Sequence, residues 1–157
     1  MGMAPLPLRA AARVIALDND HRVLLLRYEE NGGFWATPGG ALNGGEDHVT
    51  ALLRELNEEL GVDADAVDLG ELVAERSHDH KVGNREVRQV ERYYRAHLAP
   101  TDIDLNRATQ PDTIRDARWW TRDELRNTAD TVYPHGLSVL ITDILAVRSL
   151  QRPVVLL

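Results

Sequence analysis

The chain has 157 residues, 43% apolar and 27% charged, which predicts one globular domain, residues 1–157, with a sizeable core. Its net charge of −7 argues against a nucleic acid polymer or an acidic membrane as partner, because either would need a broad basic face. It has no cysteine, so disulfides, thiol catalysis and cysteine-based zinc sites are excluded.

The start of the chain does not have the pattern of a targeting signal. The segment MGMAPLPLRAAARVIALD lacks a charged stretch followed by a continuous apolar run, which a signal peptide requires. No apolar run in the sequence is long enough to span a bilayer. We therefore expect a cytoplasmic protein without a membrane partner, and a homodimer is possible.

Two strands are predicted before the first glycine-rich loop. Residues 9–17 alternate loosely between apolar and polar types and end at a turn signal, residues 18–20. Residues 23–26 follow as a continuous apolar run, so we expect the two strands to pair as a hairpin. A loop punctuated by glycines then extends over residues 38–45.

The segment after this loop has the pattern of an amphipathic helix. Asp47 is a suitable N-cap, and Gly61 can end the helix after Leu60. Apolar residues recur at helical spacing and predict one buried stripe, which consists of Val49, Leu52, Leu53, Leu56 and Leu60.

Three carboxylates share a different face of this helix. Glu55, Glu58 and Glu59 stand at i, i+3 and i+4, so their side chains are close and repel one another. Arg54 is the only basic residue of the helix, and it can pair with Glu58 or reach back to Glu46. Oxygen ligands of this kind suit Mg²⁺ or Mn²⁺, with substrate phosphates and waters completing the shell. A solvated acidic helix face is the alternative.

The glycine loop bears on the same chemistry. Its glycines let the backbone approach a ligand closely, so the carbonyl of Gly39 is a candidate for a further metal ligand. The sequence contains neither a GxxxxGK[ST] P-loop nor a GxGxxG fingerprint. Any handling of phosphate would therefore depend on the metal and on arginines.

The rest of the sequence predicts further strands and two helices. Strand patterns occur at residues 67–75, 86–98 and 114–120, with a helix as the alternative for residues 86–98. A polar connection is expected at residues 78–84. Strands and helices in this order predict an α/β fold in which a mixed sheet is covered on both faces.

Both predicted C-terminal helices have recognisable starts. Thr121-Arg122-Asp123-Glu124 is a capping box for a short helix. Gly136 precedes a terminal amphipathic helix, whose apolar side consists of Leu137, Leu140, Ile141, Ile144, Leu145 and Val147.

The segment GALNGGEDHVTALLRELNEELGV resembles the Nudix box, G-x5-E-x7-R-E-U-x-E-E-x-G-U, where U is aliphatic. It begins at Gly40 and ends at Val62, and every fixed position is filled. Two flanking matches are looser, namely Trp35-x-x-Pro38-Gly39-Gly40 before the box and Arg118-Trp119-Trp120 after it. The resemblance implies a Nudix-type α/β/α sandwich with a mixed β-sheet between helices, which agrees with the pattern of elements.

The resemblance also implies a chemistry. Nudix hydrolases cleave a phosphoanhydride bond in a nucleoside diphosphate linked to another moiety, X, with Mg²⁺ or Mn²⁺. By this resemblance Glu55, Glu58 and Glu59 would hold the metal, and either Glu55 or Glu58 would act as the base. Arg54 and Glu46 would orient these carboxylates.

Further positions matter for the metal site and for the substrate. Many Nudix enzymes add a carboxylate from outside the helix, and the candidates here are Glu91, Asp112 and Asp116. Many relatives carry a glutamate where this chain has Thr113. Downstream proline and tyrosine signatures for ADP-ribose and for dinucleoside polyphosphates are replaced by Ser77 and Asp79, so X is not predicted.

Three residue pairs outside the box are weaker candidates. His78 and His80 stand in the predicted polar connection, where exposure is favoured over metal binding. Trp119 and Trp120 lie on an alternating strand, so one should enter the core and at most one is free to stack on a base. The pair Tyr93–Tyr94 poses the same choice.

Two rival functions were weighed. A non-hydrolytic module that senses a nucleotide could keep the fold, but the filled box argues against it. An isomerase of isoprenoid diphosphates shares the fold and would want a nucleophilic cysteine, which this chain lacks.

Overall fold

The structure is a computed structural model that describes residues 5–109, 114–146 and 153–157. Its strands are β1 (Leu8–Leu17), β2 (Val23–Tyr28), β3 (Phe34–Ala36), β4 (Gly39–Ala41), β5 (Asp68–Val82), β6 (Arg85–His97), β7 (Ile114–Trp120), β8 (Val132–Tyr133) and β9 (Val154–Leu156). Its α-helices are α1 (His48–Leu60), α2 (Arg122–Asn127) and α3 (Leu137–Leu145). Short 3₁₀ turns are η1 (Glu30–Gly32), η2 (Ala64–Ala66), η3 (Pro100–Asp102) and η4 (Leu105–Arg107).

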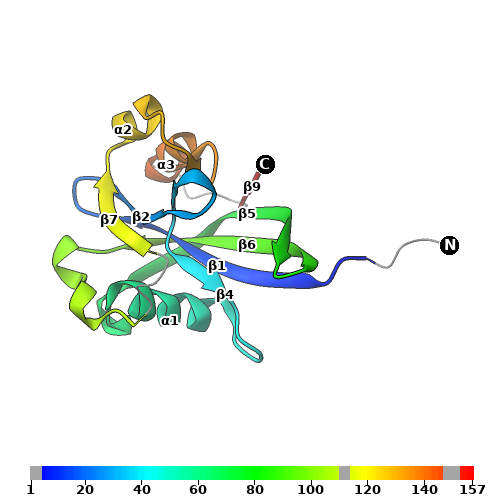
Figure 1. The fold of residues 1–157 in the computed structure, drawn as a ribbon. Helices are drawn as coiled ribbons and strands as arrows, with labels where there is room; N and C mark the ends of the chain where they lie inside the picture. Colours follow the sequence, from blue (N-terminus) through cyan, green and yellow to red (C-terminus); the bar gives the residue numbers. More distant parts are fainter. Residues whose placement is uncertain (1–4, 110–113, 147–152) are drawn as a thin grey trace.

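One mixed sheet joins the described strands in the order β8-β3-β2-β1-β6-β5-β9, with β4 paired to β1 and β7 paired to β2. β1 and β6 are parallel, whereas β5 and β6 form an antiparallel hairpin. α1 lies on one face of the sheet, and α2 and α3 lie on the other (Figure 1). The expected α/β/α sandwich with a mixed sheet is confirmed.

A separate hydrophobic core fills each face of the sheet. Successive residues of a strand point to opposite faces, so Val14 packs toward α1 and Ile15 packs toward α3. Leu52, Leu56 and Leu60 of α1 are fully buried against the sheet. Burial of each such leucine contributes roughly 1.5–3 kcal/mol, so this contact holds the helix firmly in place.

The ends of the helices follow the predicted signals. Asp47 caps α1 by accepting a hydrogen bond from the amide of Thr50 at 2.7 Å, and Gly61 ends it with φ of +64°. Thr121 and Glu124 form the predicted capping box of α2. The expected terminal helix is α3, although Val147 lies outside the described residues. None of the described helices has the length and apolar character needed to cross a membrane.

Two expectations about the strands need correction. The first two strands do pair, but only at Leu17 and Val23, because β1 pairs with β4 and β2 pairs with β3 further along. The predicted polar connection at residues 78–84 is wrong, since β5 continues to Val82 and pairs with β6 along its length. The antiparallel backbone ladder keeps these polar residues extended where an apolar pattern is missing. Residues 86–98 are a strand and not a helix.

Candidate active site

Two glycines bring the backbone against the helix α1. A Cβ atom at Gly40 would lie 2.6 Å from Oε1 of Glu55, and one at Gly39 would lie 2.1 Å from the carbonyl oxygen of Ala12. Gly39 also has φ of +137°, a conformation that side chains rarely adopt. Glycine at position 40 therefore lets β4 lie directly beside the carboxylate of Glu55, and glycine at position 39 lets the same strand lie tightly against β1.

The glutamates occupy a more buried face than predicted. Glu55 and Glu59 are 9% and 6% exposed, and they belong to the side of α1 that faces the sheet. Glu58 is half-buried. The apolar stripe is correspondingly narrower, because Val49 is 38% exposed. The alternative of a fully solvated acidic face is therefore wrong for Glu55 and Glu59.

Arg54 holds several carboxylates at once. Its Nε and Nη2 donate to the two oxygens of Glu46 at 2.8 and 2.9 Å. Its Nη1 donates to Glu55 and Glu58, each at 3.1 Å. The carbonyl of Ala41 accepts a further bond from Nη2 at 3.0 Å. The predicted contacts of Arg54 with Glu46 and Glu58 are thus present, and the planar fork of arginine explains how one side chain makes them all.

Glu59 lies deeper, against strand β4. One oxygen accepts a hydrogen bond from the amide of Gly39 at 2.9 Å, and the other accepts one from the hydroxyl of Tyr28 at 3.3 Å. Burial, together with the charge of Glu55, raises the pKa of Glu59 to about 8. Burial also raises the pKa of Glu55. Because burial is the main cause of both shifts, a cation beside these carboxylates would favour their ionised forms.

The residues fit a hard divalent cation in chemical type. All donors are carboxylate or carbonyl oxygens, which Mg²⁺ and Mn²⁺ prefer, and the missing side chain of Gly40 lets the carboxylate of Glu55 lie against the backbone of β4. In the described part of the chain, no three His, Cys, Asp or Glu side chains are gathered tightly enough to form a finished metal site. The oxygens of Glu55 and Glu58 accept bonds from Arg54, and the carbonyl of Gly39 accepts one from Nη1 of Arg13 at 3.2 Å.

The candidate carboxylates from outside the helix have different surroundings. Glu91 is 3% exposed and forms ion pairs with Arg13 at 2.8 Å and Arg76 at 3.0 Å. Asp116 is exposed on β7 and accepts a bond from the amide of Ala117. Asp112 lies outside the described residues. A role for any of them as metal ligand stays a prediction.

The weaker candidates divide as follows. Trp120 is buried beside Trp35, with ring centroids 5.2 Å apart, whereas Trp119 is only partly buried. Tyr93 is buried, as expected for one member of its pair. His78 and His80, both on β5, line one cavity together with residues of β1 and β6.

Sequence reasoning missed Arg13, Tyr28 and Arg76, which contact the predicted site residues. Arg13 did leave one signal, a charge flanked by alanines and other apolar residues in the middle of a strand. Such a charge is buried only with a partner. The partner itself, Glu91, lies 78 positions further along the chain and could not be assigned from local pattern.

The fold and this site define an α/β enzyme of the hydrolase class. The family model described as NUDIX domain matches residues 7–139. The chain therefore belongs to the Nudix family and is a Nudix hydrolase.

Individual relatives extend this finding. An RNA pyrophosphohydrolase of Dinoroseobacter shibae is 31% identical over 144 residues, which cover 84% of this chain and 86% of that protein. An RNA pyrophosphohydrolase of Pelagibacter ubique is 38% identical, but the match covers only 36% of this chain and 37% of that protein. The crystal structure of a C. elegans Ap4A hydrolase binary complex superposes with a TM-score of 0.64 and 19% identity, covering 87% of this chain and 94% of that one. This last likeness supports the fold alone.

Proposed function

We propose that this protein uses Mg²⁺ or Mn²⁺ to hydrolyse a phosphoanhydride bond in a nucleoside diphosphate derivative. The observation that carries the proposal is the contact of Arg54 with Glu46, Glu55 and Glu58 beside Gly40. One arginine holds three carboxylates in a fixed arrangement, and the cluster keeps a negative excess that suits a cation.

In this proposal each residue of the cluster has a defined role. Glu55, Glu58 and Glu59, with the carbonyl of Gly39, would hold the cation. When bound, a divalent cation shields phosphate charge and makes water more acidic. Glu55 or Glu58 accepts the proton of the attacking water. Arg54 and Glu46 keep the carboxylates in position.

A panel of candidate compounds is needed to identify the substrate. Several relatives bear the name RNA pyrophosphohydrolase, and a structural neighbour bears the name Ap4A hydrolase. The test panel therefore contains nucleotide sugars, ADP-ribose, Ap4A, oxidised nucleoside triphosphates and a short RNA with a 5′-triphosphate. The negative net charge favours the small molecules over the RNA.

The test is turnover of this panel by the purified full chain, with Mg²⁺ or with a chelator. We expect cleavage of a phosphoanhydride bond in at least one compound, only with the cation, detected as a nucleotide plus a phosphorylated X, as two nucleotides from Ap4A, or as phosphate or pyrophosphate from a triphosphate. Glu58→Gln should slow that reaction by roughly 10²–10⁴-fold if Glu58 is the base. Glu86→Gln, an exposed glutamate of β6, is the matched control and should leave the rate unchanged. Stoichiometric binding of a panel member without any turnover would support the rival nucleotide sensor.

A further inference from the structure

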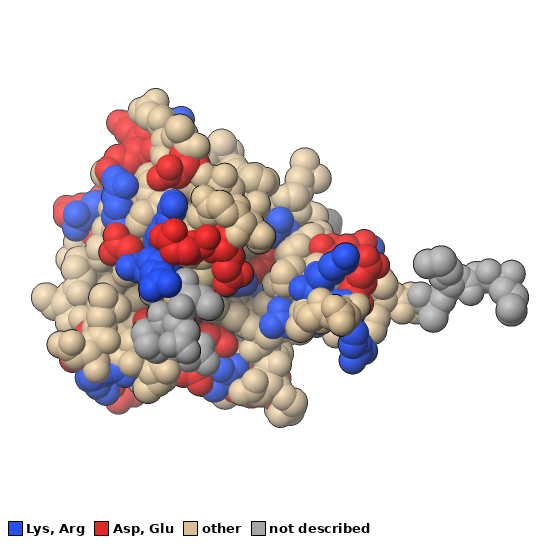
Figure 2. Space-filling model, viewed as in Figure 1, with Lys and Arg blue, Asp and Glu red and all other residues tan. Residues whose placement is uncertain are grey.

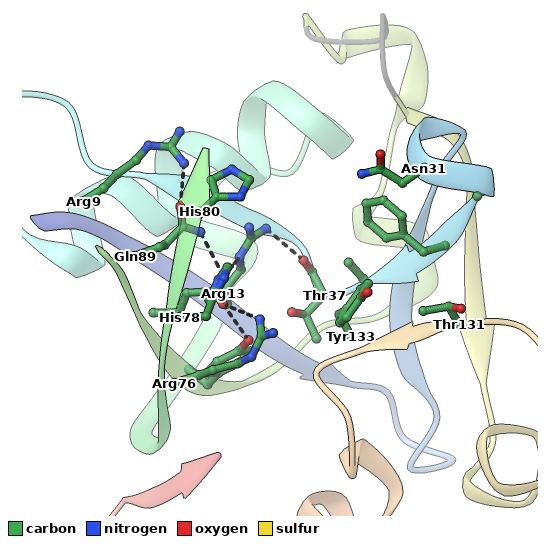
Figure 3. Close-up of a pocket in the computed structure, with 15 residues that line it drawn as sticks. Arg9, Arg13, Asn31, Thr37, Arg76, His78, His80, Gln89, Thr131 and Tyr133 are labelled. Atoms are coloured by element: carbon green, nitrogen blue, oxygen red, sulfur yellow. Dashed lines mark hydrogen bonds and ion pairs between the residues drawn. The ribbon is translucent and has the colours of Figure 1, made fainter. Parts of the chain in front are cut away.

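A cavity of about 390 Å³ lies beside the active-site strand, between two walls of different chemistry (Figure 3). Strands β1, β5 and β6 form a basic wall with Arg9, Arg13 and Arg76. The opposite wall, from η1, β3 and β8, has aromatic and neutral polar groups, including Phe34 and Tyr133. The volume of the cavity is in the range of sites that bind small molecules.

The basic wall has more positive than negative charge. Against its three arginines stands one carboxylate, Glu91, which pairs with Arg13 and Arg76 and is the only acidic residue lining the cavity in the described chain. With neutral histidines, that leaves an excess of two positive charges in a protein whose net charge is −7. Such a local excess is costly unless water or an anion compensates it, and guanidinium groups suit phosphate in particular.

Arg9 and Arg76 are the arginines available to an anion. Nη1 of Arg9 donates to the neutral amide oxygen of Gln89 at 2.6 Å, and within the described residues Arg9 forms no ion pair. Nη1 of Arg76 donates a hydrogen bond to Glu91, and its Cζ lies 5.7 Å from the ring centroid of Tyr133. Arg13, by contrast, is bound to Glu91 and to backbone carbonyls.

The aromatic wall faces these arginines across the cavity. Phe34 and Tyr133 meet edge to face, with ring centroids 5.4 Å apart. Flat rings beside a guanidinium wall suit a ligand that combines a planar ring with a phosphate.

The cavity also connects with the catalytic glutamates. Thr37 lines it, and Arg13 reaches from its wall to the carbonyls of Thr37 and Gly39. The amide of Gly39 in turn donates to Glu59. A ligand in the cavity would therefore lie next to Gly39 of β4, beside the glutamates at which the phosphoanhydride is to be cleaved.

From this arrangement we propose that the cavity binds a second phosphate of the substrate, one that is not hydrolysed, through Arg9 and Arg76. This rests on the proposed function for its description of the ligand as substrate. Preferred substrates then carry a phosphate beyond the scissile group, either as a terminal ester on a small molecule or as the first diester of a longer chain.

The test measures binding by calorimetry to the full chain without divalent cation. The probes are adenosine 5′-monophosphate, adenosine 3′,5′-bisphosphate and the 5′-phosphorylated dinucleotide pApA. None of them has a phosphoanhydride, so the result does not depend on whether the protein is a hydrolase. We expect at least one of the two probes with a second phosphate group to bind about tenfold or more tightly than the monophosphate, as one charge-assisted contact provides. Preference for pApA would indicate a diester, and preference for the bisphosphate a terminal ester.

Variants assign the preference to the cavity. Arg76→Gln and Arg9→Gln should each remove most of it, whereas Arg88→Gln should keep it. Arg88 is an exposed arginine of β6 outside the cavity and pairs with Asp79. Arg9→Gln provides the decisive result if Arg76→Gln lowers the melting temperature, because Arg9 lacks an ion pair to lose. Equal affinity for all probes, no binding at millimolar concentration, or an equal loss in Arg88→Gln would overturn the proposal.

Discussion

Two ion clusters of opposite composition lie on either side of Gly39. The acidic cluster places one arginine, Arg54, among Glu46, Glu55 and Glu58. The basic cluster places one carboxylate, Glu91, among arginines and a histidine, namely Arg13, Arg76 and His78. The same ion-pair chemistry with reversed stoichiometry leaves opposite charge surpluses, one suited to a cation and one to an anion.

The two clusters are local features within a surface of mixed charge. On the face shown in Figure 2, acidic and basic side chains of the described residues lie next to one another. On that face, the mixed charges do not produce a broad electric field that would attract a charged ligand. Short-range contacts within the clusters must provide recognition, because exposed charges are screened beyond about 8–10 Å at physiological salt.

The largest effect on stability is expected from the basic cluster. Glu91→Gln leaves Arg13 and Arg76 without their shared carboxylate, which should lower the free energy of unfolding by roughly 2–4 kcal/mol. This is slightly below the cost of breaking a fully buried pair, because the arginines are partly exposed. Urea unfolding measures it. Glu46→Gln is the matched change in the acidic cluster and should cost clearly less, since Arg54 keeps Glu55 and Glu58. Equal losses would remove the distinction between the clusters.

A divalent cation should stabilise the acidic cluster in particular. Mn²⁺ at a hundred times its Kd should raise the melting temperature by roughly 5–10 °C, because it binds the native carboxylates and not the dispersed ones. The rise should vanish in the double variant Glu58→Gln/Glu59→Gln and persist in Glu91→Gln. A rise that depended on Glu91 instead would assign the metal site to that carboxylate.

The next effect is kinetic and concerns Arg54. Arg54→Lys keeps the charge but cannot bond several carboxylates with a planar fork, so kcat should fall by roughly 10–100-fold. KM should change little if Arg54 acts through the glutamates. Steady-state kinetics on a substrate found in the panel distinguish this from an unchanged kcat with a raised KM, which would indicate direct contact with phosphate.

The smallest effect is a pH dependence of the basic cluster. Burial acts to raise the pKa of Glu91, but the charge and hydrogen bond of Arg13 outweigh it, so the pKa lies below the ordinary 4.5. A lowered pKa means that the ionised carboxylate stabilises the fold above about pH 4.5 and loses this contribution as the pH falls. The stability difference between wild type and Glu91→Gln should therefore narrow in acid, by at most about 1.4 kcal/mol per pH unit. A difference that is constant from pH 7 to pH 3 would contradict this assignment.

Local patterns predicted the elements better than their partners. Asp47, Gly61 and the capping box at Thr121 mark helix ends through contacts within a few residues, so the helices could be predicted. Strands β3, β4, β8 and β9 were not predicted, because their two or three residues are too few to show an alternation. The glycine loop expected over residues 38–45 is wrong where β4 pairs with β1.

Long-range contacts explain what could not be predicted about the site. The spacing of the glutamates placed them on one helix and suggested the reach of Arg54. The burial of Glu55 and Glu59 depends on β4 lying against α1, which sequence spacing alone does not show. The basic cluster depends on the parallel pairing of β1 with β6, where Arg13 is opposite Tyr93, and no local signal indicates that pairing.

The outer part of the β5–β6 hairpin contributes to the cavity and, apart from the ion pairs of Glu91, little to the packing of the fold. Beyond Ala74 the hairpin carries Arg76, His78 and His80 to the cavity, yet neither hydrophobic cluster of the described chain includes a residue between 75 and 92. α1 and its glutamates belong to a different core on the opposite face of the sheet. Apart from Glu91, whose ion pairs with Arg13 and Arg76 support the fold, this hairpin can thus accumulate substitutions with little effect on α1, which makes it the natural region in which to redesign, by loop grafting, the compounds that the enzyme accepts.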